Sequence, residues 1–262
     1  METGKELRLR RFCRRGGTVV IPLDHALFAE PPAPLVELRR LVKTISETEA
    51  DGILVSSGMV KYISPVVGDL AVIIRLDGTH TRMGKHLERI DLVTSVESVL
   101  ALGADMVVVN IFVGTENEDV QLAKLGKVAT DCRRYGVPLL AEMIPASTLN
   151  YHYGREKKTA APEEINRDIC LVSRLGAEIG ADCIKTHYSG NKESFKYVTE
   201  STPVPVWIAG GPKSKSDDSG FLKMIEEAVE AGAKGVTIGR NVWQRENPRE
   251  MIRSLCKILH HS

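Results

Sequence analysis

Eight short apolar segments rich in β-branched residues recur along the chain, and longer segments with amphipathic helical spacing separate them. The apolar segments show little alternation of polar and apolar residues, which is typical of parallel strands buried on both faces. We expect the strands at residues 18–23, 52–55, 71–76, 106–110, 138–144, 183–186, 204–209 and 235–238. We expect helices at residues 35–48, 94–102, 120–135, 162–180, 192–199, 218–231 and 248–259. Such repeating strand–helix units predict a parallel sheet.

Eight parallel strands can close into a barrel or lie open as a doubly wound sheet. In an open sheet, functional residues gather near one switch point, whereas in a barrel they follow many strands. Here polar residues and glycines follow strands along the whole chain: Asp24, Asp77, Asn110, Lys185, Gly210 and Gly239. This distribution favours a (β/α)₈ TIM barrel.

The length of 262 residues suits one such barrel, since (β/α)₈ domains commonly have about 250 residues. We therefore expect a single domain over residues 1–262. Hydrophobic residues make up 43% of the chain and charged residues 26%, so there is enough apolar material for a core.

Composition also limits the partners and the compartment. Aromatic residues are only 5% and the net charge is +1, so no nucleic-acid partner is expected. The basic opening, from Lys5 to Arg15, is interpreted as a solvated helix. No apolar run is long enough to span a membrane, and the N-terminus does not resemble a signal peptide. Five scattered cysteines suggest buried thiols and no zinc site, and together these features predict a cytoplasmic protein without a metal.

Lys185 ends an otherwise apolar predicted strand, within Ala-Asp-Cys-Ile-Lys-Thr-His. In a barrel it would point into the mouth, where burial disfavours the ammonium and leaves some neutral amine. A neutral amine can attack a ketone or aldehyde and form an iminium, which withdraws electrons during carbanion chemistry. The alternative is a lysine that simply carries the end of the strand into water.

Asp24 ends the first predicted strand and would share that face of the barrel with Lys185. Its carboxylate could move protons, or it could cap a helix or pair with an arginine. His25 and His187 directly follow the Asp24 and Lys185 segments. Each could donate a proton, although a structural role is the favoured interpretation for both.

Two glycine-containing loops follow the seventh and eighth predicted strands, where barrels often bind a substrate phosphate. Gly210, Gly211 and Lys213 lie in the first loop, and Gly239 and Arg240 lie in the second. Glycines allow backbone N–H groups to converge on an anion, and the two cations add charge-assisted contacts. A phosphorylated small molecule is therefore the expected partner.

These segments resemble the class I, Schiff-base aldolases of the archaeal fructose-bisphosphate aldolase and DeoC/LacD type, and within them the 2-amino-3,7-dideoxy-D-threo-hept-6-ulosonate synthases. The resemblance is carried by residues 22–25, 103–105, 175–182, 185–186, 209–213, 221–225 and 239–241. It implies a (β/α)₈ barrel, no metal or other cofactor, Lys185 as the Schiff-base lysine and Asp24 as a proton-handling carboxylate. It also implies a homo-oligomer of five or ten subunits.

Two departures from the family pattern bear on the reaction. The family carries Tyr-Pro-Arg-Gly after the fifth strand, with the tyrosine as general acid or base, whereas this chain has Ile144 at that position. Tyr153, Tyr151 or His187 could replace the tyrosine, with Tyr153 the first choice, or the reaction could need less acid–base help. The second departure is Arg75-Leu76-Asp77-Gly78-Thr79-His80, which is more polar than in the heptulosonate synthases and points to a different substrate.

Three hypotheses follow. The first is an aldolase or transaldolase-like lyase that acts on a phosphorylated ketose or ketone such as dihydroxyacetone phosphate, in aromatic-precursor or aminohydroxybenzoate biosynthesis or as a fructose-bisphosphate aldolase. The second is a thiolase-like transferase that passes an acyl group to coenzyme A on the same barrel. The third is a sugar-phosphate-binding barrel without catalysis.

Overall fold

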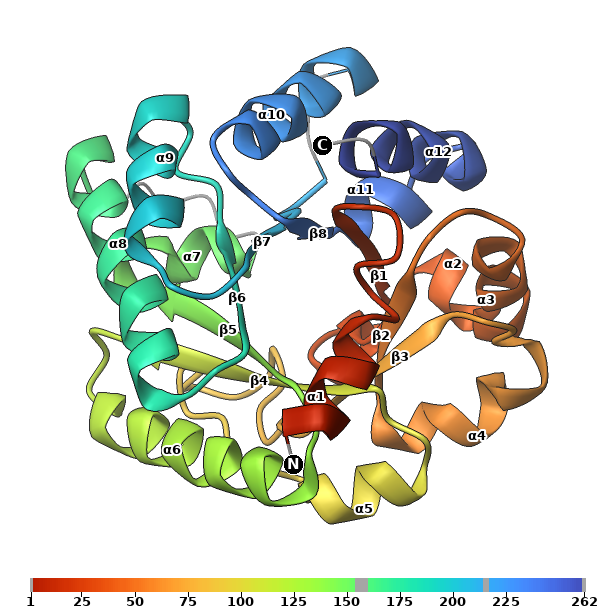
Figure 1. Cartoon of the computed structure of the whole chain (residues 1–262), viewed down its shortest axis with the longest axis horizontal. Coiled ribbons are helices and arrows are strands. Elements are labelled where there is room, and N and C mark those ends of the chain that lie inside the picture. The colour runs from red at the N-terminus through yellow and green to blue at the C-terminus, as the bar shows by residue number, and fades with distance from the viewer. Residues whose placement is uncertain (1, 154–159, 214–216, 261–262) are drawn as a thin grey trace.

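The computed structural model describes residues 2–153, 160–213 and 217–260. Its eight strands form a closed parallel barrel in chain order, in which the last strand pairs with the first. The strands are β1 (Thr18–Pro22), β2 (Gly52–Ser56), β3 (Ala71–Arg75), β4 (Met106–Val113), β5 (Leu139–Pro145), β6 (Cys183–His187), β7 (Val206–Ala209) and β8 (Gly235–Thr237). Figure 1 looks along this barrel, with the helices arranged around the ring of strands. The expected barrel is confirmed, and the open sheet is excluded.

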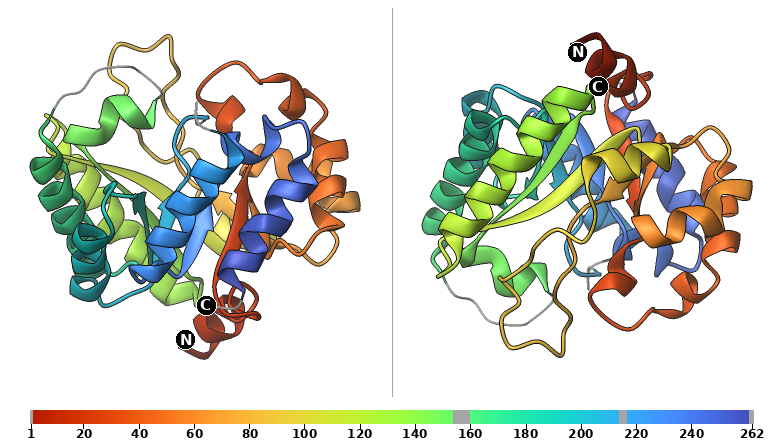
Figure 2. Two further views of the ribbon diagram at one scale, coloured as in Figure 1. Left: turned by 90° about the horizontal axis from the view of Figure 1, so that it is seen from above. Right: turned by 90° about the horizontal axis from the view of Figure 1, so that it is seen from below.

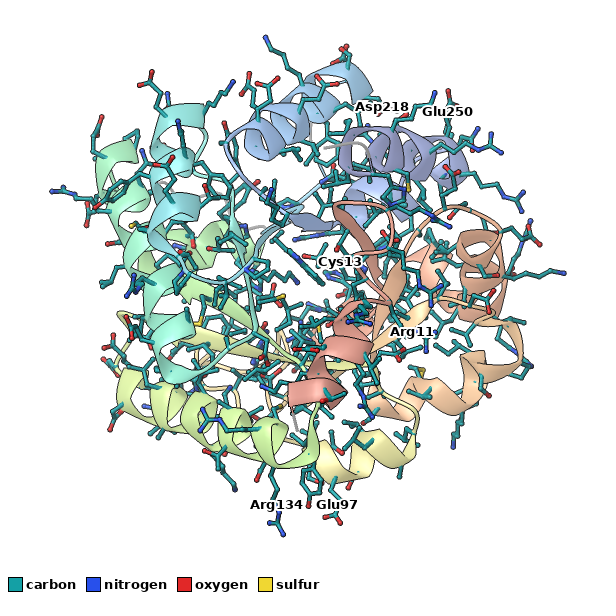
Figure 3. The ribbon with its side chains drawn as sticks, viewed as in Figure 1. Arg11, Cys13, Glu97, Arg134, Asp218 and Glu250 are labelled. Atoms are coloured by element: carbon teal, nitrogen blue, oxygen red, sulfur yellow. The ribbon has the colours of Figure 1, made fainter. Side chains whose placement is uncertain are left out.

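The helices follow the strands as the sequence pattern predicts, with some differences in detail. They are α1 (Glu2–Leu9), α2 (Ala33–Val36), α3 (Leu38–Ser46), α4 (Val60–Ile63), α5 (Val96–Ala101), α6 (Glu118–Tyr135), α7 (Leu149–His152), α8 (Pro162–Ile179), α9 (Lys192–Ser201), α10 (Asp218–Glu230), α11 (Arg240–Trp243) and α12 (Pro248–Leu259). Short 3₁₀ turns add η1 (His25–Leu27), η2 (Ser57–Met59), η3 (Ser64–Val66) and η4 (Ala146–Thr148). Charged side chains on the outer helices, such as Glu97 and Arg134, point away from the barrel (Figure 3).

Most predicted elements differ from the structure by one or two residues at their ends, and one helix and one strand differ more. The helix expected at residues 35–48 is divided into α2 and α3, because Glu37 has φ −97° and ψ 52°, outside the helical region. Strand β4 continues to Val113 instead of ending at Asn110, and all eight of its residues are buried.

The inner face of the barrel carries an apolar layer beneath a polar one. A compact cluster of buried residues comes from strand after strand: Val20, Leu54, Ile73, Val108, Leu140, Cys183 and Trp207. Side chains two residues apart on a strand point to the same face. The residues two positions further along five of these strands are Arg75, Asn110, Glu142, Lys185 and Ala209, and they line a cavity. The strands therefore seal the centre of the barrel and present their polar side chains at their C-terminal ends.

The opposite end of the barrel is closed by the segment that follows α1. Phe12 is fully buried and its ring centroid lies 5.9 Å from that of Trp207. The interpretation of the basic opening as a solvated helix is wrong for two of its residues, because Lys5 forms an ion pair with Asp182 at 2.8 Å and Arg11 forms one with Asp105 at 2.9 Å. Figure 2 shows both chain ends at this end of the barrel.

Three aspartates tie neighbouring strands together at the same end. Each stands directly before a strand, and its carboxylate accepts a hydrogen bond of 2.8 Å from a backbone N–H near the start of the preceding strand. The pairs are Asp51 with Val19, Asp105 with Val72, and Asp182 with Leu139. Because these residues lie far from the cavity, we assign them to the stability of the barrel.

The five cysteines are free, and three of them are buried as expected. Cys13 is exposed and Cys170 is half-buried, so the expectation of buried thiols is wrong for Cys13. Within the described residues, no helix combines the length and the apolar character that crossing a membrane requires.

Candidate active site

A cavity of about 500 Å³ opens at the C-terminal ends of the strands. Its wall includes Asp24 after β1, Arg75 at the end of β3, Glu142 on β5 and Lys185 on β6. This is the end of a (β/α)₈ barrel at which catalytic residues are found. The structure thus brings Asp24 and Lys185 into one cavity.

Lys185 is only 5% exposed. Its strand position is directly beside that of Glu142 in the β5–β6 register, and the Lys185 Nζ atom lies 2.7 Å from Glu142 Oε1. Burial opposes ionisation of Glu142, but the positive charges of Lys185 and Arg75 outweigh it and hold the pKa of the carboxyl well below its ordinary value. Glu142 is therefore a carboxylate, and it is paired with the lysine ammonium.

Arg75 connects Glu142 to two further carboxylates. Its Nη2 atom donates to Glu142 Oε2 at 2.7 Å, its Nη1 atom donates to Asp77 Oδ1 at 3.2 Å, and its Nε atom donates to Asp24 Oδ2. Lys124 completes the network through Asp77 Oδ2 at 3.1 Å. With Lys185 included, this buried network contains three cations and three carboxylates, so its formal charges cancel. Such pairing is what makes buried charges tolerable.

Two histidines border the cavity near Lys185, of which His187 is buried and His152 is half-buried. His187 lies two residues beyond Lys185 on β6 and is 4% exposed, and its ring centroid is 5.5 Å from that of His152 at the end of α7. Burial lowers the pKa of His187 to about 4 and that of His152 well below its ordinary value. Both rings are therefore neutral near pH 7. Neither ring nitrogen of His187 has a hydrogen-bond partner within the part of the chain that the structure describes.

The two predicted phosphate loops also border the cavity. Arg240 is half-buried, and its Nη2 atom donates to the His152 carbonyl at 3.3 Å. Lys213 is exposed and its Nζ atom donates to the Gln244 carbonyl at 3.0 Å. Gly211 has φ +63°, and a Cβ atom there would lie 2.4 Å from the Tyr151 hydroxyl oxygen, so this position requires glycine.

The glycine loops are also joined to each other. The Asn241 side chain donates hydrogen bonds of 2.9 Å to the carbonyl oxygens of Gly210 and Pro212, and in this way links α11 to the loop after β7. Gly239, which precedes α11, lies against the backbone of β1, since a Cβ atom there would be 3.0 Å from the Pro22 carbonyl oxygen. The two loops therefore form one wall of the cavity.

Comparison with known proteins identifies this arrangement. Residues 18–245 match the DeoC/LacD family aldolase. The chain belongs to the DeoC/LacD aldolase family. It is 33% identical over 259 residues to 2-amino-3,7-dideoxy-D-threo-hept-6-ulosonate synthase 1 of Archaeoglobus fulgidus, covering 98% of this chain and 91% of that protein.

Two further relatives of this DeoC/LacD aldolase extend the comparison. A 2-amino-4,5-dihydroxy-6-oxo-7-(phosphonooxy)heptanoate synthase of Streptomyces griseus is 34% identical over 247 residues, covering 93% of this chain and 85% of that protein. An archaeal fructose-1,6-bisphosphate aldolase, solved with its catalytic lysine covalently bound to the carbinolamine intermediate of the substrate, superposes with a TM-score of 0.85 at 27% identity, covering 97% of this chain and 98% of that one. The resemblance to Schiff-base aldolases is thus confirmed.

Ile144 stands where the family resemblance leads us to expect a tyrosine. Its side chain is buried in a small cluster with Ile90 and Phe112. Tyr153 packs against that cluster and borders the cavity. The Tyr153 hydroxyl donates to the Leu87 carbonyl at 3.1 Å and lies 2.8 Å from His80 Nε2. Burial, helped by the charge of Glu142, raises the pKa of Tyr153, so its hydroxyl holds its proton firmly.

Three residues at the centre of the cavity are absent from the sequence-based site. No sequence pattern singles out Glu142 or His152. Arg75 is noted only as part of the segment from Arg75 to His80, which is more polar than in the heptulosonate synthases. The available sequence signal for Glu142 is the two-residue repeat of a β-strand. By this repeat Leu140, Glu142 and Ile144 share one face of β5, and Cys183, Lys185 and His187 share one face of β6. His25, for which a structural role is expected, borders the cavity with its ring centroid 6.1 Å from that of Trp243.

Among the described residues, no group of three or more His, Cys, Asp or Glu side chains is arranged to hold a metal ion.

Proposed function

We propose that this protein is a class I aldolase in which Lys185 forms a Schiff base with the carbonyl group of a phosphorylated ketone or ketose. The observation that carries the proposal is the Lys185 amine itself. It is buried on β6, faces a cavity of about 500 Å³, and belongs to a chain of the DeoC/LacD aldolase family. A ligand of the size of a triose or heptose phosphate fits such a cavity.

An iminium at Lys185 would withdraw electrons from the adjacent carbon and stabilise an enamine there. The enamine can then attack an aldehyde, or in the reverse direction can arise from cleavage of a carbon–carbon bond. Asp24 is the proposed proton-handling carboxylate for this step. Its position supports the role, since it is 8% exposed, borders the cavity, and is oriented by Arg75.

The phosphate of the substrate is assigned to the wall formed by the loops after β7 and β8. Arg240 supplies a half-buried guanidinium there, and Lys213 supplies a second cation at the rim. Gly210, Gly211 and Gly239 give the backbone its close approach to the ligand. Placing the anion at this wall leaves the charge-balanced network around Lys185 free to receive the neutral carbonyl end of the substrate.

Carbon–carbon bond chemistry is favoured over acyl transfer to coenzyme A and over a non-catalytic role. The matched family consists of aldolases, and the relatives above are synthases of seven-carbon keto acids or a fructose-bisphosphate aldolase. We place the reaction in the supply of aromatic precursors, as the resemblance to the heptulosonate synthases implies. The proposed reaction uses no metal, and we expect a homo-oligomeric enzyme.

Reductive trapping tests this function. Dihydroxyacetone phosphate with cyanoborohydride should inactivate the protein and add the mass of the reduced ketone adduct at Lys185 alone. The K185M variant should acquire no adduct under the same treatment, whereas a matched substitution of an exposed lysine, K234M, should be labelled like the wild type. A wild-type protein that stays active and unmodified would refute the proposal.

A further inference from the structure

Schiff-base formation at Lys185 requires a group that moves protons at the lysine nitrogen. The ammonium must lose a proton before its nitrogen can attack a carbonyl carbon. The carbinolamine that results must then expel its hydroxyl group as water, and this needs a proton donor. The family resemblance implies a tyrosine after the fifth strand as acid or base, but this chain has Ile144 there, and an isoleucine transfers no proton.

Glu142 is placed to perform this task. Its Oε1 atom lies 2.7 Å from Lys185 Nζ, which is within direct proton-transfer distance. Its Oε2 atom accepts a hydrogen bond of 2.7 Å from Arg75, which fixes the plane of the carboxylate while Oε1 faces the amine. Glu142 is 3% exposed and Arg75 is also 3% exposed, so bulk water does not compete for the proton.

The other titratable groups of the cavity are less well placed. The Tyr153 hydroxyl already donates its one proton to the Leu87 carbonyl. Asp24 pairs with the Arg75 Nε atom, whereas among the described residues the carboxylate that pairs with the Lys185 amine is that of Glu142. Burial keeps the His187 and His152 rings neutral and weakly basic.

We propose that Glu142 is a catalytic residue that carries protons to and from the Lys185 nitrogen during formation and breakdown of the Schiff base. This inference rests on the proposed function of Lys185. First, the ammonium transfers one proton to the Glu142 carboxylate, and the nitrogen lone pair forms a bond to the carbonyl carbon. The electrons of the carbonyl π bond move to oxygen, which takes the second proton of the nitrogen, and a neutral carbinolamine results.

Glu142 then returns its proton to the carbinolamine hydroxyl, which leaves as water as the nitrogen lone pair forms the carbon–nitrogen double bond. The iminium nitrogen keeps one hydrogen and one positive charge. One ammonium and one ketone have thus become one iminium and one water. Because Glu142 is again a carboxylate beside a cation, the buried network is neutral both before and after the step, and no charge is left without a partner.

The test compares trapping rates with dihydroxyacetone phosphate and cyanoborohydride as the probe. In E142Q the amide keeps the shape of the side chain, but only its carbonyl oxygen can accept a hydrogen bond, and it takes no proton from the ammonium. We expect the rate of adduct formation on Lys185 to fall by at least about 100-fold, the usual contribution of a positioned acid or base. In E142D the carboxylate is retained but withdrawn by one methylene, and we expect about a tenfold fall.

The matched control is D77N. Asp77 is as deeply buried as Glu142 and also accepts a hydrogen bond from Arg75, but it contacts Lys124 instead of Lys185. If Glu142 acts by proton transfer, D77N should lose no more than about threefold in the trapping rate, because the acid–base group at the nitrogen is intact. Urea denaturation of each variant establishes that it is folded.

Each outcome decides between the two proposals. A wild type that is labelled at Lys185, with a slow E142Q and a nearly normal D77N, supports the role of Glu142. If the wild type is labelled but E142Q reacts at the wild-type rate, the role of Glu142 is overturned. The same holds if E142Q and D77N are equally slow. In both cases the proposed function of Lys185 is retained. If E142Q does not fold, a wild-type rate in E142D overturns the role. A wild type without adduct overturns the proposed function, and the role of Glu142 with it.

Discussion

His187 should make the stability of this protein depend on pH. Its ring is 4% exposed, and burial lowers its pKa in the folded state to about 4, against an ordinary value of 6.5. Between these two values the unfolded chain binds a proton at this ring and the folded chain does not. Stability is therefore lost as the pH falls through this window.

The size of this loss of stability follows from the part of the interval between the two pKa values that the pH change covers. Between pH 6.5 and pH 5, about 1.5 pH units at about 1.36 kcal/mol per unit give a loss of about 2 kcal/mol from His187. The carboxylate of Glu142, whose pKa is lowered on folding, contributes stability that is lost only as the pH falls below its ordinary value of 4.5. It therefore adds nothing to the change between pH 7 and pH 5.

Urea denaturation at pH 7 and at pH 5 measures this effect, with H187Q as the variant that cannot titrate. The free energy of unfolding of the wild type should fall by about 2 kcal/mol more than that of H187Q over this interval. Titrating groups that lie away from His187 contribute equally to both proteins and cancel in the comparison. If H187Q and the wild type lose equal stability, the assignment of His187 as a buried neutral ring is wrong.

Three further predictions concern the network and the cavity wall. R240M should raise KM for a phosphorylated substrate by about tenfold or more with a smaller change in kcat, since a charge-assisted hydrogen bond contributes about 1.5–3 kcal/mol; a loss confined to kcat contradicts the phosphate assignment. K124M should lower the free energy of unfolding in urea by about 3–5 kcal/mol, because it removes a cation that pairs with the buried Asp77. A decrease below about 1 kcal/mol would disprove the contribution of this ion pair to stability. I144Y should lower the free energy of unfolding by about 1–3 kcal/mol, because the larger side chain overpacks the cluster around Phe112. An unchanged free energy of unfolding would show that the cluster accommodates a tyrosine.

The architecture could be predicted from the sequence because every strand is buried and so carries the same apolar signature. The barrel end at which Asp24 and Lys185 meet follows from the same pattern, since parallel strands all end on one side. The division of α2 from α3 could not be predicted, because it depends on the single backbone conformation of Glu37.

The role of Glu142 could not be predicted from the sequence either, and the physical reason differs from that for Glu37. A carboxylate inside an apolar strand can serve as a buried structural ion or as a partner for any cation near it, and only the strand register identifies that cation. In the β5–β6 pairing Glu142 stands beside Lys185, and in the β4–β5 pairing it stands beside Asn110. Registers between strands depend on how the whole barrel closes, which no local segment specifies.

For Tyr153, the sequence suggests a role but could not predict the hydrogen-bond partners of the hydroxyl group. The sequence places a tyrosine nine residues after Ile144, and this makes it a reasonable replacement for the missing family tyrosine. The structure brings Tyr153 to the cavity, but its hydroxyl is engaged by the Leu87 carbonyl and by His80. Those partners belong to the connection between β3 and α5, whose path the sequence pattern does not determine.

A crystal structure of the protein soaked with dihydroxyacetone phosphate tests the central claim most directly. We predict continuous density from Lys185 Nζ to the ketone carbon, the Glu142 carboxylate beside that nitrogen, and the phosphate at the Arg240 wall. A ligand bound in the cavity without a covalent bond to Lys185, or bound covalently to another residue, would contradict the account.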